Sequence, residues 1–185
     1  MTPLERINII RKWILEYVET MDKPANCLVV GISGGVDSAV VSTICAMTGM
    51  KTLVASMPIS QRPEHHDLSI KHKNWITTKY SNCFGVEIDL THTFLSFENQ
   101  MIDMKFKDEM GLANSRARMR MMCLYQLSAS TSGIVVGTGN KIEDFGVGFY
   151  TKYGDGGVDI SPIADCTKTE VWAMAKELGI LEEIQ

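Results

Sequence analysis

The residues with the clearest chemical potential form a glycine-rich hexapeptide, Ser33-Gly34-Gly35-Val36-Asp37-Ser38. It follows a short apolar run typical of a buried strand, residues 27–32, and precedes a helical pattern over residues 37–48. Such a turn lets backbone N–H groups approach an anion, and the helix N-terminus adds partial positive charge there. The sequence therefore predicts a phosphate-binding loop.

Asp37 is an unexpected neighbour for a phosphate, because two negative charges repel. A Mg2+ ion between them would remove the repulsion, since Mg2+ accepts oxygen ligands from carboxylates and phosphates alike. The hydroxyls of Ser33 and Ser38 can donate to phosphate oxygens. The loop has neither the lysine of a Walker A motif nor the G-x-G-x-x-G spacing. The alternative is a tight strand–helix turn with capping serines and no ligand.

The hexapeptide resembles the pyrophosphate loop of the N-type ATP pyrophosphatases, which cleave ATP to AMP and pyrophosphate while adenylating a substrate. Three later segments narrow this resemblance: residues 114–120, 137–143 (GTGNKIE) and 149–159 (FYTKYGDGGVD), with Thr167-Lys168 soon after. Together they resemble the NAD synthetase family, and the resemblance runs from the first predicted helix to the last residue.

This resemblance implies a ligase that forms a C–N bond. It would amidate deamido-NAD+ with ammonia through an adenylated nicotinate, releasing AMP and pyrophosphate. The residues that match the family's ATP site are Gly31, Ile32, Ser33, Gly34, Gly35, Val36, Asp37, Ser38, Thr138 and Lys168.

The resemblance also implies individual roles. Asp37 and Glu143 would hold Mg2+, and Lys168 would offset charge as pyrophosphate leaves. Asp155 is a third catalytic candidate, as a holder of ammonium.

Deamido-NAD+ would contact Arg118, Lys152 and Asp159, and Gln61 is a possible adenine contact. The family is a homodimer with the dinucleotide bound across the interface. Arg118 therefore has a predicted substrate or subunit contact.

Other chemically suggestive residues have plainer interpretations. Arg116 and Arg120 lie four apart and could be solvated or paired on one helix face. The four histidines lack metal-ligand spacing and are predicted at the surface: His65, His66, His72 and His92. A group of methionines is predicted to pack in a core or a subunit interface: Met119, Met121 and Met122.

The elements that must position these residues alternate between strand and helix. Strands are predicted at residues 27–32, 52–57, 84–90 and 133–137, and residues 145–162 as a glycine-rich loop. Helices are predicted at residues 3–20, 37–48, 63–80, 92–104 and 113–130, and from a Thr167–Glu170 capping box to Gly179. This order predicts an α/β fold with a doubly wound, mostly parallel sheet and helices on both faces. The resemblance implies a Rossmann-like fold of the adenine nucleotide alpha hydrolase type.

Composition bounds the remaining choices. The 185 residues carry a net charge of −4 and a mean hydropathy of +0.01, which suits one globular domain. The absence of a basic excess argues against nucleic acid as a partner. No apolar run reaches membrane-spanning length and no secretory signal is apparent, so we expect no membrane partner and a cytoplasmic location.

The five cysteines are scattered and contain no C-x-x-C pair. This spacing argues against a zinc, iron–sulfur or redox site, and predicts reduced, mostly buried thiols.

The domain prediction is a single synthetase domain over residues 1–185. Family members continue beyond the position of Gln185, so the resemblance implies that the family's C-terminal segment is missing. No amidohydrolase domain precedes the first predicted helix, so free ammonia is the expected nitrogen donor.

Two alternatives remain at this point. A tRNA-modifying adenylating enzyme would need a basic surface, which this acidic chain lacks. A non-catalytic nucleotide-binding module would be indicated by loss of Asp37, Glu143 or Lys168, and all three are present.

Overall fold

A parallel four-stranded sheet in the order β3-β2-β1-β4 forms the centre of the molecule. The structure is a computed structural model that describes residues 1–60, 63–148 and 150–185. The strands are β1 (Cys27–Ile32), β2 (Lys51–Ser56), β3 (Cys83–Glu87) and β4 (Gly133–Val136). The α-helices are α1 (Pro3–Glu19), α2 (Val36–Met47), α3 (Pro63–Lys79), α4 (Thr91–Asp103), α5 (Glu109–Thr131) and α6 (Lys168–Leu178).

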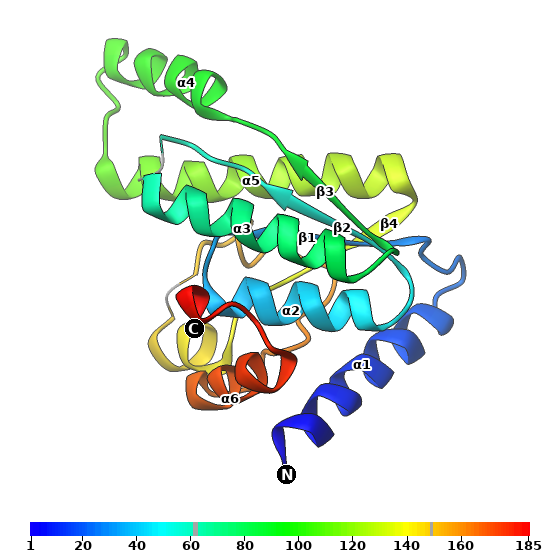
Figure 1. Cartoon of the computed structure of the whole chain (residues 1–185). Coiled ribbons are helices and arrows are strands. Elements are labelled where there is room, and N and C mark those ends of the chain that lie inside the picture. The colour runs from blue at the N-terminus through cyan, green and yellow to red at the C-terminus, as the bar shows by residue number, and fades with distance from the viewer. Residues whose placement is uncertain (61–62, 149) are drawn as a thin grey trace.

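Successive side chains of β1 point to opposite faces of the sheet, as in any β-strand. Leu28 and Val30 join a core cluster with residues of α1, α2 and α6, whereas Val29 packs toward Leu124 and Leu127 of α5. Figure 1 shows α2, with α1 and α6 below it, on one side of the sheet and α5 on the other. The predicted doubly wound architecture is confirmed.

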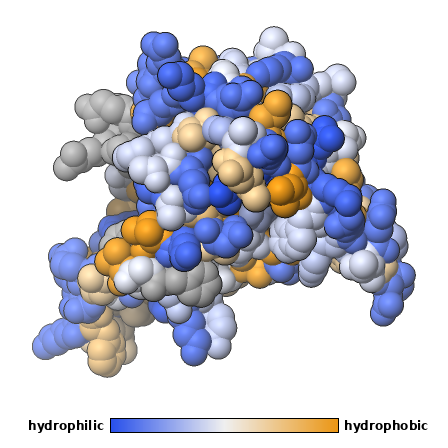
Figure 2. All heavy atoms as spheres, turned by 90° about the horizontal axis from the view of Figure 1, so that it is seen from below, coloured by the Kyte–Doolittle hydropathy of each residue, from blue (hydrophilic) through white to orange (hydrophobic). Residues whose placement is uncertain are grey.

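The surface formed by the lower helices is mixed in polarity. Figure 2, which views the molecule from below, shows mainly hydrophilic side chains interrupted by small hydrophobic patches. Large apolar side chains exposed on α1 and α6 include Ile9, Trp13 and Trp172. Scattered exposure of this kind is ordinary for a folded domain.

Strand order creates a switch point between β1 and β4. From β1 the chain proceeds through β2 to β3 on one side, and later returns to β4 on the other side of β1. The β1–β4 register pairs Val30 with Val136, so both strands end near the same edge. Open α/β sheets bind ligands in the crevice at such a point.

Most element boundaries agree with the predictions within two residues, and the exceptions have local causes. Helix α5 begins at Glu109 rather than at residue 113, because the Asp108 side chain accepts the Gly111 N–H at 2.6 Å and caps the helix. Strand β3 ends at Glu87 rather than at residue 90, where its pairing with β2 ends. A short π-helical turn, Ile142–Val147, overlaps the start of the predicted 145–162 loop.

The predicted burial of the cysteines is confirmed: all five lie within the described residues with free thiols, and four of them are buried. Burial raises the pKa of Cys83 to about 12, so its thiol stays protonated at neutral pH. Within the described residues, no helix combines the length and apolarity needed to cross a membrane.

The surface prediction is wrong for His72. This ring is 1% exposed between α2 and α3, where its Nε2 lies 2.8 Å from the Ser42 hydroxyl and it stacks on Trp75. His66 is half-buried with its Nε2 3.2 Å from Glu87, and His92 is exposed. The side chain of His65 lies outside the described part of the chain.

Burial lowers the pKa of His72 to about 4. Between its ordinary pKa and that value the unfolded chain binds more protons than the folded one, so stability falls as the pH falls. The loss reaches about 3 kcal/mol for a shift of this size. We expect His72→Gln to remove this part of the pH dependence, measured by urea unfolding at about pH 7 and about pH 4.5.

His92→Gln is the matched control, because it makes the same substitution at an exposed position on α4. A His72→Gln protein that loses stability with acid as steeply as wild type would contradict the buried, neutral ring.

Candidate active site

The predicted phosphate loop lies between β1 and α2 and is shaped by its own serines. The Ser38 hydroxyl donates to the Gly35 carbonyl at 2.9 Å and accepts the Ser33 N–H at 3.2 Å. Gly34 has φ of +86°, a left-handed conformation that glycine adopts without strain. The first turn of α2 follows directly, so its unpaired N–H groups and dipole face the loop.

A lysine and two carboxylates meet beside this loop. The Lys168 ammonium hydrogen-bonds Asp37 Oδ2 and donates to Glu143 Oε1 at 3.2 Å. The Asp37 side chain is 15% exposed and that of Lys168 is 31% exposed, so water screens the contact only in part. The fold thus brings together three residues predicted from the sequence, since Lys168 is 131 positions from Asp37 and 25 positions from Glu143.

The protonation of Lys168 follows from opposing effects. Burial lowers its pKa, but hydrogen bonds and charge from Asp37 and Glu143 outweigh burial and leave the pKa above its ordinary value. The side chain is therefore a stable cation at neutral pH.

The start of α6 positions Lys168. The predicted capping box is present, with the Glu170 carboxylate accepting the Thr167 N–H at 2.8 Å. Arg6 of α1 donates to the other oxygen of Glu170. The first turn of α6 is thereby anchored to the first helix of the chain.

Asn140 belongs to the same site and was missed from the sequence. Its side chain is completely buried, and its Nδ2 donates to Asp37 Oδ1 at 3.0 Å. Its Oδ1 accepts the N–H groups of Ile142 and Glu143 at 3.0 and 3.1 Å. The available signal was an asparagine between a buried strand and a helical turn, where this residue type commonly caps backbone N–H groups.

Two adjoining cavities open at the switch point. A small one of about 130 Å3 is bordered by the phosphate loop, Thr138, Glu143 and Asp155. A larger one of about 680 Å3 shares Ser33, Thr138 and Asp155 with it, and extends along mainly apolar side chains of α5. An apolar cavity with a few polar groups at one end is typical of a small-molecule site.

The predicted deamido-NAD+ residues lie outside both cavities. Arg118 donates its Nε–H to the Lys152 carbonyl at 3.2 Å, and the Lys152 ammonium lies over the Tyr153 ring. Asp159 accepts the Val135 N–H at 2.7 Å and the Tyr125 hydroxyl at 3.0 Å, and so joins β4 to α5. Their substrate roles stay predictions.

The residues with two interpretations are now placed. Arg116 pairs with Glu98 at 3.9 Å, whereas Arg120 donates to the Met57 carbonyl at 2.9 Å and borders the larger cavity. Gln61 lies outside the described residues, as does Phe149 of the 149–159 segment.

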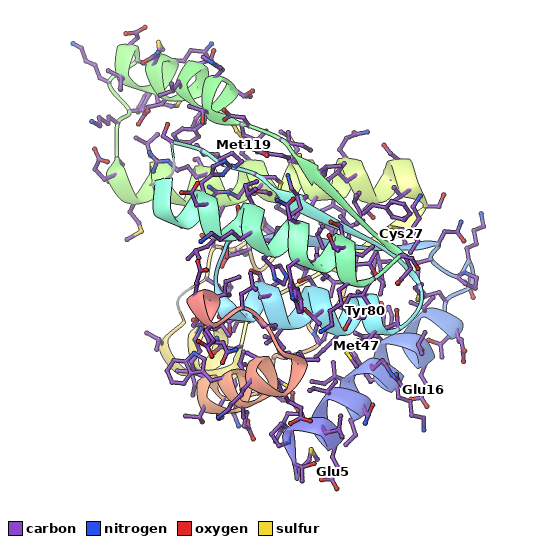
Figure 3. The ribbon with its side chains drawn as sticks, in the orientation of Figure 1. Glu5, Glu16, Cys27, Met47, Tyr80 and Met119 are labelled. Carbon is purple, nitrogen blue, oxygen red and sulfur yellow. The ribbon has the colours of Figure 1, made fainter. Side chains whose placement is uncertain are left out.

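The three methionines differ in environment. Met119, labelled between α4 and α5 in Figure 3, packs against a core cluster that includes Phe94. Met121 borders the larger cavity, and Met122 is 60% exposed.

Removal of the Lys168 charge should destabilise the protein. In Lys168→Met the Asp37 and Glu143 carboxylates lose their shared cation, at a cost of about 1–2 kcal/mol for a partly screened contact. Chemical denaturation measures this difference. The control is Lys12→Met, whose 77% exposed side chain pairs with Glu16 on the surface and should change stability by less than about 0.5 kcal/mol. Equal stabilities for the two variants would contradict the Lys168 contact.

Comparison with known proteins shows which family this chain matches. The model of the NAD synthase family matches residues 6–185. The curated NH(3)-dependent NAD(+) synthetase of Carboxydothermus hydrogenoformans is 37% identical over 181 residues, covering 97% of this chain and 72% of the relative. The enzyme of the same name from Mesoplasma florum is 33% identical, covering 91% and 68%. The chain spans 61% of the Saccharolobus solfataricus relative, at 37% identity over 96% of this chain.

Solved structures show the same similarity. The NMN synthetase from Francisella tularensis matches with a TM-score of 0.88 and 28% identity, over all of this chain and 74% of its own. The NH3-dependent NAD synthetase from Campylobacter jejuni, in complex with the nitrate ion, matches with a TM-score of 0.88 and 27% identity, over all of this chain and 76% of its own.

Proposed function

Since the chain belongs to the NAD synthase family, we propose that it amidates deamido-NAD+ with ammonia and cleaves ATP to AMP and pyrophosphate. The observation that carries this proposal is the meeting of Lys168, Asp37 and Glu143 beside a glycine-rich loop at the sheet's switch point. A tRNA-modifying enzyme or a non-catalytic module has no comparable support.

Asp37 and Glu143 suit a Mg2+ ion that is shared with ATP. Their oxygens already converge on one cation, the Lys168 ammonium. The described residues contain no cluster of three or more metal-ligating side chains, and Mg2+ shared with phosphates commonly takes one or two carboxylates. When bound, the ion would neutralise charge on the triphosphate.

The loop and Lys168 would then have separate roles toward ATP. Backbone N–H groups of the loop hold the pyrophosphate end, which leaves the α-phosphorus open to the nicotinate carboxylate. A carboxylate oxygen bonds to that phosphorus as the bond to pyrophosphate breaks, and the Lys168 ammonium offsets charge on the leaving group.

Amide formation follows at the activated carboxyl group. Ammonia adds to its carbonyl carbon and gives up a proton, AMP leaves, and the nicotinamide of NAD+ remains. Asp155 borders both cavities, where it would hold ammonium beside the reacting carbonyl.

A second protomer would account for the substrate residues outside the cavities. Within α5, which is described along its whole length, two of 23 residues are buried, Leu112 and Ser128. Met110 and Met122 of this helix are 69% and 60% exposed. We therefore propose a homodimer that covers this helix and brings Arg118, Lys152 and Asp159 to bound deamido-NAD+.

Two further predictions, the domain organisation and the location, belong to this proposal. The single sheet and its cores support residues 1–185 as one synthetase domain. The five free thiols support a reducing, cytoplasmic location.

The reaction is tested by its products. With ATP, deamido-NAD+, ammonium and Mg2+ we expect NAD+, AMP and pyrophosphate, measured by chromatography, and ADP as product would contradict the mechanism. At fixed total ammonium the rate should rise with pH, because unprotonated ammonia is the nucleophile.

Asp37→Asn should lower kcat/KM by about 100-fold or more while the protein stays folded, because the neutral amide is a poor Mg2+ ligand. Asp22→Asn, at an exposed turn, is its control.

The acceptor should be varied in the same assay. One structural neighbour is an NMN synthetase, so nicotinate mononucleotide is the informative competitor of deamido-NAD+. We expect the dinucleotide to have the higher kcat/KM. Preference for the mononucleotide would place the second nucleotide half outside the site.

The dimer is tested by light scattering. Met122→Glu should weaken self-association at least about tenfold, because a charge is desolvated in the proposed interface. The matched control is Ile9→Glu, which adds the same charge at a 53% exposed position on α1, on the other side of the sheet. A wild-type monomer at working concentration would overturn the proposed assembly.

A further inference from the structure

We propose that Asn140 is a positioning residue that holds Asp37 and the Glu143 turn in the arrangement needed to bind Mg2+ together with ATP. This inference rests on the proposed function and assigns a role to a side chain that is neither charged nor exposed. Its basis is the placement of one amide between the two carboxylate-bearing segments.

Every hydrogen-bonding direction in this contact is defined. An amide nitrogen donates and an amide oxygen accepts, so Nδ2 toward Asp37 and Oδ1 toward the N–H groups of Ile142 and Glu143 leave one orientation. The side chain is 0% exposed, so water cannot replace either partner cheaply. The neighbouring Lys141 N–H donates to the Cys166 carbonyl at 3.0 Å, which ties the same turn to the chain just before α6.

The two donors to Asp37 differ in charge, and this difference gives Asn140 its role. Oδ2 contacts the Lys168 ammonium, while Oδ1 contacts the neutral Asn140 amide. A metal ion that binds Asp37 competes with the ammonium, because two cations repel. The neutral amide does not compete in this way, so it can keep the carboxylate oriented while the cation changes.

Groups that orient metal-binding side chains have measurable effects on affinity. Removal of such a partner typically weakens metal binding by about 10- to 100-fold. The Asn140 side chain orients Asp37 by donating to its carboxylate, and orients Glu143 by accepting its backbone N–H. Its loss should therefore act on the metal-dependent part of ATP binding.

A purely structural cap is the competing explanation, and Asn140→Asp separates the two. Aspartate keeps an oxygen that accepts the Ile142 and Glu143 N–H groups, since it is itself a good capping residue. It replaces the donor toward Asp37 with a second oxygen. The turn is preserved, while the neutral amide donor to Asp37 is replaced by a carboxyl group.

Asn82→Asp is the matched control. The Asn82 Nδ2 donates to the carbonyls of Ala46 and Met50 at 2.9 and 2.7 Å, at the end of the sheet away from the site. The same substitution there also converts a donor into an acceptor and adds a charge. It reports the general cost of such a change without touching the carboxylates.

The measurement is ATP affinity by calorimetry, with and without Mg2+, for wild type and each variant. The ratio of the two affinities isolates the contribution of the metal and cancels damage to the pocket as a whole. We expect wild type and Asn82→Asp to share one ratio, and Asn140→Asp to lower it about 10- to 100-fold. Asn140→Ser, which keeps an acceptor, adds no charge and is too short to reach Asp37, should show the same loss, and it decides the outcome if the two variants differ or Asn140→Asp does not fold.

The outcomes distinguish this inference from the proposed function. An Asn140→Asp or Asn140→Ser protein with the wild-type ratio would overturn the positioning role and leave the function untouched. A wild-type protein whose ATP affinity does not respond to Mg2+ would overturn the metal assignment and this role together.

Discussion

The contact of one ammonium group with two carboxylates is the interaction on which the candidate site depends. Lys168 comes from the first turn of α6, Asp37 from the first turn of α2, and Glu143 from the turn after β4. Their side chains meet because parallel strands in a doubly wound sheet present their carboxyl ends at one edge. Two carboxylates beside an anion-binding loop would repel each other and the ligand, and the lysine compensates part of that charge.

Local signals in the sequence predicted most of the helices and strands. Short apolar runs predicted the buried strands, and the Thr167–Glu170 capping box predicted the start of α6. The phosphate loop was also predictable, because its glycines, serines and flanking elements are contiguous. In each case the causes of the structure lie within a few residues of one another.

Long-range partners explain what could not be predicted. The burial of His72 depends on Ser42, 30 residues away, and nothing around His72 indicates it. The contacts of Asp159 with Val135 and Tyr125, 24 and 34 residues away, could not be read from the sequence either. Asn140 was overlooked because it is uncharged, although its amide contacts a carboxylate 103 residues away. Residue type indicates possible chemistry, whereas tertiary contacts decide which of it is used.

Small residues determine the shape of the larger cavity. A Cβ at Gly31 would lie 3.3 Å from Leu124, and one at Gly154 would lie 2.9 Å from the Cβ of Ala117. β1 and the loop around Gly154 therefore approach α5 closely, and both glycines border the larger cavity.

The link between Arg6 and Glu170 has a different consequence, because these residues are 164 positions apart. When the chain emerges from a ribosome, α1 is made early but its partner α6 follows only after all four strands. The buried face of α1 is therefore completed only when α6 has been made, so Lys168 and the α6 residues that complete this core cluster are synthesised together.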